Sequence, residues 1–208
     1  MILFKIRLAA LGVAIALLIT ACGDGASDES TTTTAPVAVA TTGSVPPTAA
    51  DVKQEFPITI AAANGDLEIP ALPTKIVSMS ATHTEMLFAI GAGDQVVAVD
   101  AFSNYPEGVP TTDLTGFAPN VEAIIGYGTD LVVTDGDWDG TSMGALSDLG
   151  VAVLILPAAL TLDEVYAQLE QLGAATDHLA EAAGLVAQMQ TDINEILASV
   201  PRPQKPVT

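Results

Sequence analysis

Short apolar runs alternate with segments of helical character over residues 76–156, and this alternation limits the possible folds more than any other feature of the chain. The runs typical of strands cover residues 76–78, 95–100, 131–134 and 151–156, and helical segments at about 84–90, 120–125 and 141–149 lie between them. Strands of a parallel sheet are buried on both faces, so they are apolar along their whole length. The sequence therefore predicts an α/β fold in which a parallel sheet is flanked by helices.

Further elements are expected on either side of this sheet. An Asn64-Gly65 pair between two short apolar runs is typical of a β-hairpin. After the last strand we expect a helix over residues 162–172, with Gly173 just past its end. Asp177 then caps a long amphipathic helix that reaches about residue 199, a length of roughly 33 Å.

The first 21 residues have the zones of an export signal, namely a positive start, an apolar run and small residues before a cleavage point. The uncharged run covers residues 8–19, too short for a bilayer core that needs about 20 residues. Residues 19–22 resemble the lipobox at which a lipoprotein signal is cleaved, and Cys22 is the only cysteine. We therefore predict a signal peptide over residues 1–21 and a lipid anchor at Cys22 on the outer face of the cytoplasmic membrane. An ordinary signal peptide with a cysteine nearby is the alternative.

The remaining residues divide into a tether, one domain and the long helix. Residues 22–53 are rich in Gly, Ser, Thr, Ala and Pro, a composition that predicts a flexible tether. We assign residues 54–175 to a single α/β lobe and residues 176–200 to the long helix. The chain holds 25 acidic residues against six basic ones. Such a charge disfavours nucleic acid and anionic lipid surfaces as partners.

Signatures of catalysis are not found in the sequence. It has no P-loop and no Gly-x-Ser-x-Gly elbow. Gly91 and Gly93 follow a helix and precede a strand, the reverse of the order in a dinucleotide-binding motif. His83 and His178 lie far apart, and neither has metal-ligand spacing to Cys or carboxylates. We predict that the chain is not an enzyme and has no cofactor and no metal site of its own.

The loops that follow the predicted strands are rich in aromatic residues. In open α/β sheets, ligands bind beyond the carboxyl ends of the strands. The only Trp, two of the five Phe and one of the three Tyr lie in the loops at these ends. Such loops suit a flat, partly apolar ligand. The candidate ligand-binding residues are Ser80, Ala81, Thr82, Tyr105, Phe117 and Trp138.

Several residues in or near these loops could have a structural role instead of binding a ligand. Phe102 could pack back into the core, and Trp138 could cap a helix. His83 could face the ligand, although a solvated histidine is the commoner outcome. Thr82 and Glu85 have the spacing of a capping box, which we prefer to a metal role for Glu85.

Five segments share the pattern of a known family. They are residues 75–93 (KIVSMSATHTEMLFAIGAG), 104–106 (NYP), 120–124 (NVEAI), 130–133 (DLVV) and 149–153 (LGVAV). In this order and spacing they resemble the cobalamin and iron-siderophore substrate-binding proteins of ABC importers, over about residues 56–200. The family usually has Pro before the Asp-Leu-Val of the third strand, where this chain has Thr129.

The resemblance implies two α/β lobes joined by a long helix, with the ligand held between them and delivered to a permease without chemistry. It implies a metal chelate as ligand, namely cobalamin, a ferric siderophore or haem. Tyr105, Phe117 and Trp138 resemble the ligand-facing aromatic residues, and Glu122 resembles the acid that docks on permease arginines. An acid in the first turn of a helix is also favoured by the helix dipole, so both interpretations of Glu122 stay open.

Family members carry a second lobe after the long helix, whereas this sequence reaches only Thr208. Residues 201–208 look like the approach to that lobe's first strand. The sequence therefore predicts the first lobe and connecting helix of a lipid-anchored solute-binding component. The alternative is a surface interaction lipoprotein that uses the same scaffold and captures no solute.

Overall fold

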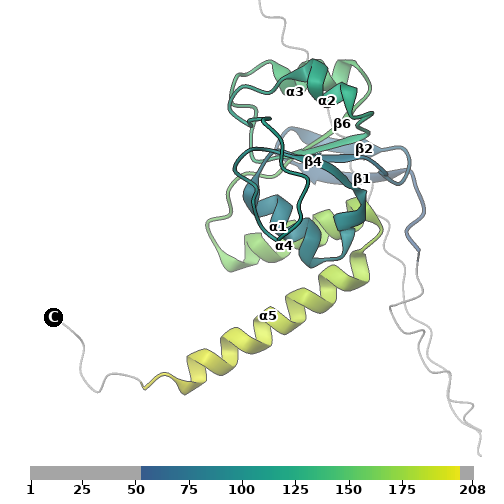
Figure 1. Cartoon of the computed structure of the whole chain (residues 1–208). Helices are drawn as coiled ribbons and strands as arrows, with labels where there is room; N and C mark the ends of the chain where they lie inside the picture. Colours follow the sequence, from purple (N-terminus) through teal and green to yellow (C-terminus); the bar gives the residue numbers. More distant parts are fainter. Residues whose placement is uncertain (1–52, 202–208) are drawn as a thin grey trace, which may run out of the picture. The chain divides into compact units, whose positions relative to one another are not determined.

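A single parallel sheet organises the part of the chain that the computed structural model describes, residues 53–201 (Figure 1). Its strands are β3 (Ile76–Ser78), β4 (Val96–Val99), β5 (Leu131–Thr134) and β6 (Ala152–Ile155). They lie in the order β4-β3-β5-β6, and all neighbours pair in parallel. The predicted α/β class is confirmed. The predicted signal peptide, Cys22 and nearly all of the predicted tether lie outside the described residues, as do residues 202–208.

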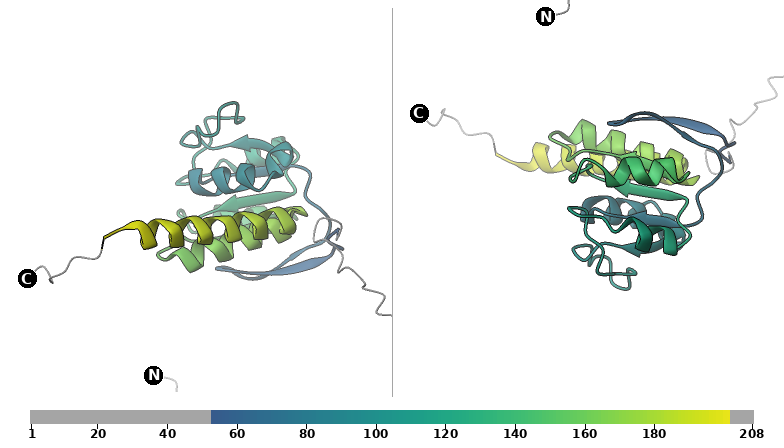
Figure 2. Two further views of the ribbon diagram at one scale, coloured as in Figure 1. Left: turned by 90° about the horizontal axis from the view of Figure 1, so that it is seen from below. Right: turned by 90° about the horizontal axis from the view of Figure 1, so that it is seen from above.

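Helices cover both faces of this sheet. One face carries α1 (Ala81–Ala89) and α4 (Leu162–Thr176), which contact each other and are both visible in the left view of Figure 2. The other face carries α2 (Val121–Gly126) and α3 (Ser142–Asp148). Because both faces are covered, all four residues of β5 are buried.

The strand order creates a switch point between β3 and β5. The connection from β3 to β4 contains α1, whereas the connection from β4 to β5 contains α2 on the opposite face. The loops after β3 and β5 therefore diverge at the carboxyl edge of the sheet. Open α/β sheets bind their ligands in the crevice at such a point.

The predicted hairpin is present as β1 (Ile58–Ala62) and β2 (Gly65–Ile69), which pair antiparallel. Gly65 has a φ of +105°, a backbone conformation that favours glycine. The side-chain nitrogen of Asn64 donates to the carbonyl of Val153 at 3.0 Å. The Asn-Gly turn thus also attaches the hairpin to the edge strand β6.

The predicted end of the penultimate helix at Gly173 is wrong. The helix α4 continues to Thr176 and ends at Asp177, which has a left-handed φ of 62°. A Cβ on Gly173 would lie 2.6 Å from Cβ of Ala182. The glycine therefore permits a close approach of two helices instead of ending one. Asp177 also does not cap the long helix, because that position is taken by His178.

The long helix is α5 (Leu179–Ser199), of 21 residues. Its buried residues are Ala182 and Val186, both near its beginning. Towards its end Ile196 and Leu197 are exposed. Among the described residues, no helix combines the length and the apolar character that a membrane span requires.

The beginning of α1 also differs from expectation. The helix starts at Ala81, and its N-cap is Ser80, whose side chain makes no capping hydrogen bond. Thr82 and Glu85 both lie inside the helix, so the predicted capping box is wrong. The Ser80 carbonyl already accepts the first helical hydrogen bond, from the Thr84 N–H, so the helix begins directly after β3 and before Thr82.

Candidate functional site

A cavity of about 420 Å³ lies at the carboxyl ends of β3, β4 and β5. The loops after these strands and the segment before α2 supply its walls. The lining residues are Met79, Ser80, Ala81, Thr82, Asp100, Phe102, Gly116, Phe117, Asp135 and Trp138. Five of the six candidate ligand-binding residues thus lie around one cavity, at the place where the topology favours a ligand.

Three aromatic side chains stand together at this cavity. The ring centroids of Phe102 and Phe117 are 6.4 Å apart at an interplanar angle of 81°, and those of Phe117 and Trp138 are 5.9 Å apart at 51°. All three are more than half exposed, at 62%, 65% and 58%. Phe102 therefore does not pack into the core, and it was missing from the predicted set. A contiguous exposed aromatic surface is typical of a binding site.

Trp138 is held by its own loop. Its indole Nε1 donates to Oδ1 of Asp135 at 2.9 Å. A Cβ on Gly136 would lie 3.2 Å from the indole ring, so the glycine allows the ring to lie against the backbone. The alternative in which Trp138 caps a helix is wrong, because the N-cap of α3 is Thr141. The indole is thus oriented for contact and remains exposed.

The start of α3 is fixed by Asp139 instead. The Ser142 hydroxyl donates to this carboxylate, and the backbone N–H groups of Ser142 and Thr141 donate to it at 2.8 and 3.0 Å. The Ser142 hydroxyl and these backbone donors hold the pKa of Asp139 well below its usual range. The loop that carries Trp138 therefore ends in a rigid, negatively charged turn.

A buried polar network forms one wall of the cavity. Asp100 is 4% exposed, and its Oδ1 accepts from the Ser103 hydroxyl at 2.6 Å and from the Ser103 N–H at 3.0 Å. The Thr84 hydroxyl lies 3.0 Å from that of Ser103 and 2.8 Å from that of Ser78. These contacts link α1 to the end of β3 and to the loop after β4.

A close backbone approach completes this wall. A Cβ on Gly116 would lie 2.8 Å from the carbonyl oxygen of Met79. Only glycine allows the segment before α2 to approach the loop after β3 so closely. The approach places the adjacent Phe117 beside the aromatic rings of the other loops.

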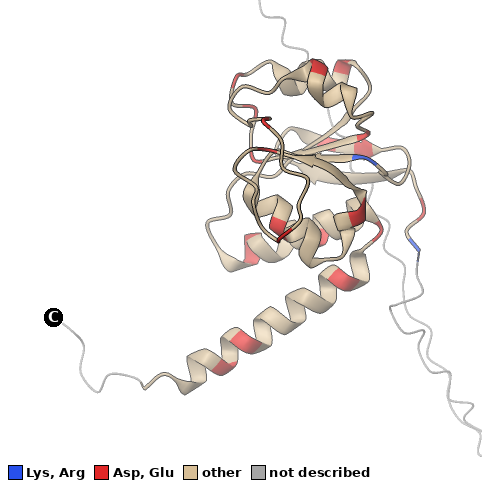
Figure 3. Cartoon of the chain, viewed as in Figure 1, with Lys and Arg blue, Asp and Glu red and all other residues tan. Residues whose placement is uncertain are grey.

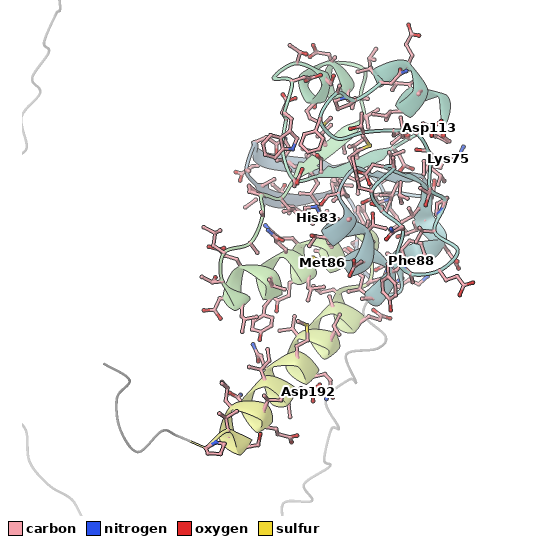
Figure 4. The ribbon with its side chains drawn as sticks, turned by 60° about the vertical axis from the view of Figure 1, so that its left-hand side comes forward. Lys75, His83, Met86, Phe88, Asp113 and Asp192 are labelled. Carbon is pink, nitrogen blue, oxygen red and sulfur yellow. The ribbon has the colours of Figure 1, made fainter. Side chains whose placement is uncertain are left out.

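His83 is buried, not solvated. Its side chain is 1% exposed and lines a second cavity of about 180 Å³ between α1 and α4. In Figure 4 it lies near Met86 on α1, and both side chains line this smaller cavity. Burial lowers the pKa of His83, although the Asp135 carboxylate and Gln168 act in the opposite direction. Sequence reasoning missed this burial because neighbouring polar residues surround the histidine in the chain.

Tyr105 and Glu122 lie apart from the cavity lining. Tyr105 is 64% exposed and does not line the cavity. Glu122 is exposed in the first turn of α2, whose N-cap Asn120 accepts from the Ala123 N–H at 3.0 Å. Within residues 53–201, no group of three or more His, Cys, Asp or Glu side chains is placed to hold a metal ion.

Comparison with known proteins gives a consistent set of relatives. Residues 76–208 match the model of a family described as periplasmic binding protein. An uncharacterized ABC transporter substrate-binding lipoprotein of Bacillus subtilis (strain 168), YvrC, is 36% identical over 146 residues, which cover 68% of this chain and 46% of the relative. A cobalamin-binding protein of Halobacterium salinarum is 29% identical over 157 residues, which cover 73% of this chain and 42% of the relative.

A solved structure supports the same assignment. The ABC-type Fe³⁺-hydroxamate transport system protein of Saccharomonospora viridis superposes with a TM-score of 0.57 at 27% identity, over 68% of this chain and 56% of that chain. The chain spans about half the length of the curated relatives it matches. The family model covers more than half of this chain, and the α/β fold agrees with that of the solved structure. The chain belongs to the periplasmic binding protein family.

Proposed function

We propose that this chain is the first lobe of a lipid-anchored solute-binding component of an ABC importer, and that its solute is a metal chelate. The observation that carries the proposal is the exposed cluster of Phe102, Phe117 and Trp138 at the carboxyl edge of the sheet. Membership of a family of extracytoplasmic binding proteins, which are not enzymes, supports binding without chemistry. The candidate chelates are cobalamin and a ferric siderophore such as a hydroxamate, in line with two similar proteins, and haem, which the resemblance of the sequence implies.

The aromatic cluster favours a ligand with an extended, partly apolar surface. Apolar area removed from water contributes about 25 cal/mol per Å², and an aromatic contact adds about 0.5–1.5 kcal/mol. Three rings that remain more than half exposed therefore keep most of this free energy available for a ligand. The polar groups of Ser80 and Thr82 lie at the same cavity and can orient the ligand.

Equilibrium dialysis of the chain against cyanocobalamin, a ferric trihydroxamate and haem tests the proposal, because all three ligands are coloured. We expect saturable binding of at least one of them, with quenching of the fluorescence of Trp138, the only tryptophan. Phe117→Ala should weaken this binding by roughly tenfold, since it removes a contact of about 1.4 kcal/mol.

The matched control is Tyr127→Ala, which removes a half-exposed ring at the end of α2, outside the cavity lining. It should leave the affinity unchanged. If the folded chain binds none of the three chelates, the proposal of solute capture is wrong. The alternative of a surface interaction lipoprotein would then be favoured.

We further propose that Glu122 contacts the permease. It is exposed on α2, a helix on the sheet face opposite to α4. Glu122→Gln should weaken pull-down of the chain by its permease in detergent without changing ligand affinity. Glu170→Gln, which removes an exposed carboxylate from α4, is the control and should have no effect. Equal pull-down of both variants and the wild type would contradict the docking role.

Anchoring through a lipid on Cys22 is proposed from the sequence. The supporting observations are the lipobox-like residues 19–22 and the similarity to a lipoprotein. We expect Cys22→Ser to move the chain from the membrane fraction to the soluble fraction of cells that express it. Membrane retention equal to that of the wild type would refute the anchor.

A further inference from the structure

Two carboxylates lie in the wall of the ligand site, and no lysine or arginine of the described residues lies beside them. Asp100 and Asp135 both line the aromatic cavity. Among residues 53–201 the only Lys or Arg side chains are Lys53 and Lys75, and neither lines this cavity (Figure 3). Lys75 directly precedes β3, so it lies at the amino edge of the sheet, away from the site. An anionic ligand would therefore meet carboxylates in this lobe without a nearby cation.

Asp100 cannot easily move away from such a ligand. It directly follows β4, it is 4% exposed, and Ser103 donates two hydrogen bonds to its Oδ1. A carboxylate held in a largely water-excluded wall interacts with ligand charge more strongly than a free surface carboxylate does.

Asp135 occupies the junction of two cavities. It lines both the aromatic cavity and the smaller cavity of about 180 Å³. Ser80 and Thr82 also line both cavities. Its Oδ1 accepts from Trp138, and no hydrogen bond from the described residues reaches its other oxygen. A ligand group that extends from the aromatic cavity into the smaller one would therefore lie beside this carboxylate.

The smaller cavity offers further hydrogen-bond acceptors. Gln168 is buried, and its Nε2 already donates to the Pro157 carbonyl at 2.6 Å. The Gln168 Oε1 has no hydrogen-bond partner among the described residues, and the His83 Nδ1, also without one, is a second acceptor in the tautomer that carries its proton on Nε2. Buried acceptors without donors are unfavourable, so a ligand that brings N–H donors is preferred there.

We propose that this lobe selects chelates that are neutral or cationic and carry N–H donors on their edge, such as primary carboxamides or an ammonium group. Chelates that carry carboxylates on the same edge are rejected. This inference rests on the proposed function and narrows its ligand class. Like charges brought together across a desolvated contact oppose binding, and unpaired acceptors add to the discrimination.

The test compares ligand pairs that differ only in one edge group. One pair is cyanocobalamin and its monocarboxylic acid, in which one peripheral carboxamide is hydrolysed. The other is a ferric trihydroxamate with a terminal ammonium and its succinylated form with a terminal carboxylate. We expect the amide or ammonium member to bind at least about tenfold more tightly at low salt, and the ratio should shrink in 1 M NaCl.

Asp135→Asn should reduce this ratio to about threefold or less, because it removes one charge and keeps an oxygen for Trp138. Asp148→Asn, at an exposed position on α3 outside both cavities, is the control and should retain the wild-type ratio. Even if Asp135→Asn folds poorly, the affinity ratio of the wild type shows whether the lobe rejects the carboxylate members.

The outcomes separate this inference from the proposed function. Equal or tighter binding of the carboxylate members would overturn the charge selection while solute capture stands. A tenfold preference that Asp135→Asn leaves intact would overturn the role of Asp135. Absence of binding for all four ligands and for haem would refute the proposed function, and the selection with it, whereas binding of haem alone, which carries two carboxylates, would overturn the selection only.

Discussion

Burial decides the behaviour of His83. The ring is 1% exposed, and its Nδ1 has no hydrogen-bond partner among the described residues. Loss of hydration favours the neutral imidazole and lowers its pKa below 6.5, whereas the charge of Asp135 and the side chain of Gln168 raise it by less. Protonation of the ring thus requires a charge in the space between α1 and α4, or local opening of the fold.

This burial predicts loss of stability in mild acid. The unfolded chain binds a proton at His83 near pH 6.5, and the folded chain binds it only at lower pH. The free energy of unfolding should therefore fall as the pH falls below about 6.5, by up to about 1.4 kcal/mol per pH unit. Urea denaturation between pH 5 and pH 7.5 measures this slope.

The control compares slopes, not absolute stabilities. With His83→Asn, the free energy of unfolding should change less between pH 5 and pH 7.5 than in the wild type. With His178→Asn, it should change as much as in the wild type. Parallel curves for the wild type and His83→Asn would show that burial of this ring does not set the acid sensitivity.

At the scale of elements, the contact between α4 and α5 depends on one glycine. The helix backbones approach so closely at Gly173 that a Cβ there would lie 2.9 Å from the His178 carbonyl oxygen. Small residues allow such an approach, and Asp177 makes the sharp reversal between the helices in a left-handed conformation. Asp177 also accepts from the Gln54 N–H at 2.6 Å, so the reversal holds the start of the folded segment.

Two glycine-to-alanine changes test this contact against helix propensity. Gly173→Ala should destabilise the fold by about 1–3 kcal/mol, because the added methyl group overpacks the contact with Ala182. Gly184→Ala, in α5 with no atom within 4 Å of the new Cβ, should stabilise it by about 0.5–1 kcal/mol. Thermal melts and urea titrations report both values. If the two changes have the same sign, close packing does not explain Gly173.

At the scale of the described molecule, packing is dense around the sheet and sparse along the end of α5. Leu172 in α4 is fully buried between the sheet and the helices. By contrast, Ile196 and Leu197 are 62% and 66% exposed. The two ends of α5 therefore have different stabilities, because helical order in proteins depends mainly on tertiary packing.

Hydrogen exchange should follow this gradient. Amides of residues 188–199 should exchange faster than those of α4, as measured by mass spectrometry. Leu172→Ala should cost about 2–5 kcal/mol of unfolding free energy, whereas Leu197→Ser should change it by less than about 0.5 kcal/mol. Comparable losses from the two substitutions would show that the end of α5 is packed in solution.

Much of the fold followed from local patterns. The predicted strand over residues 131–134 matches β5 residue for residue, because continuous burial on both faces requires an unbroken apolar run. The hairpin could be predicted from the Asn64-Gly65 pair for an equally local reason: its turn needs a positive φ, which glycine adopts readily. Residues 80–82, Phe117 and Trp138 could be placed at the site because parallel topology brings strand ends to one edge.

Tertiary structure alone decided what these residues contact. Phe102 joins Phe117 across a gap of 15 positions, His83 is buried against α4, and Gly173 lies against Ala182. Periodicity along the chain reports only which face of an element is apolar. Contacts between distant segments depend on the approach of packed elements and on which polar groups they enclose. The sequence by itself therefore determined the α/β sheet and the edge at which the aromatic cavity lies, and the packing decided the shape and charge of that cavity.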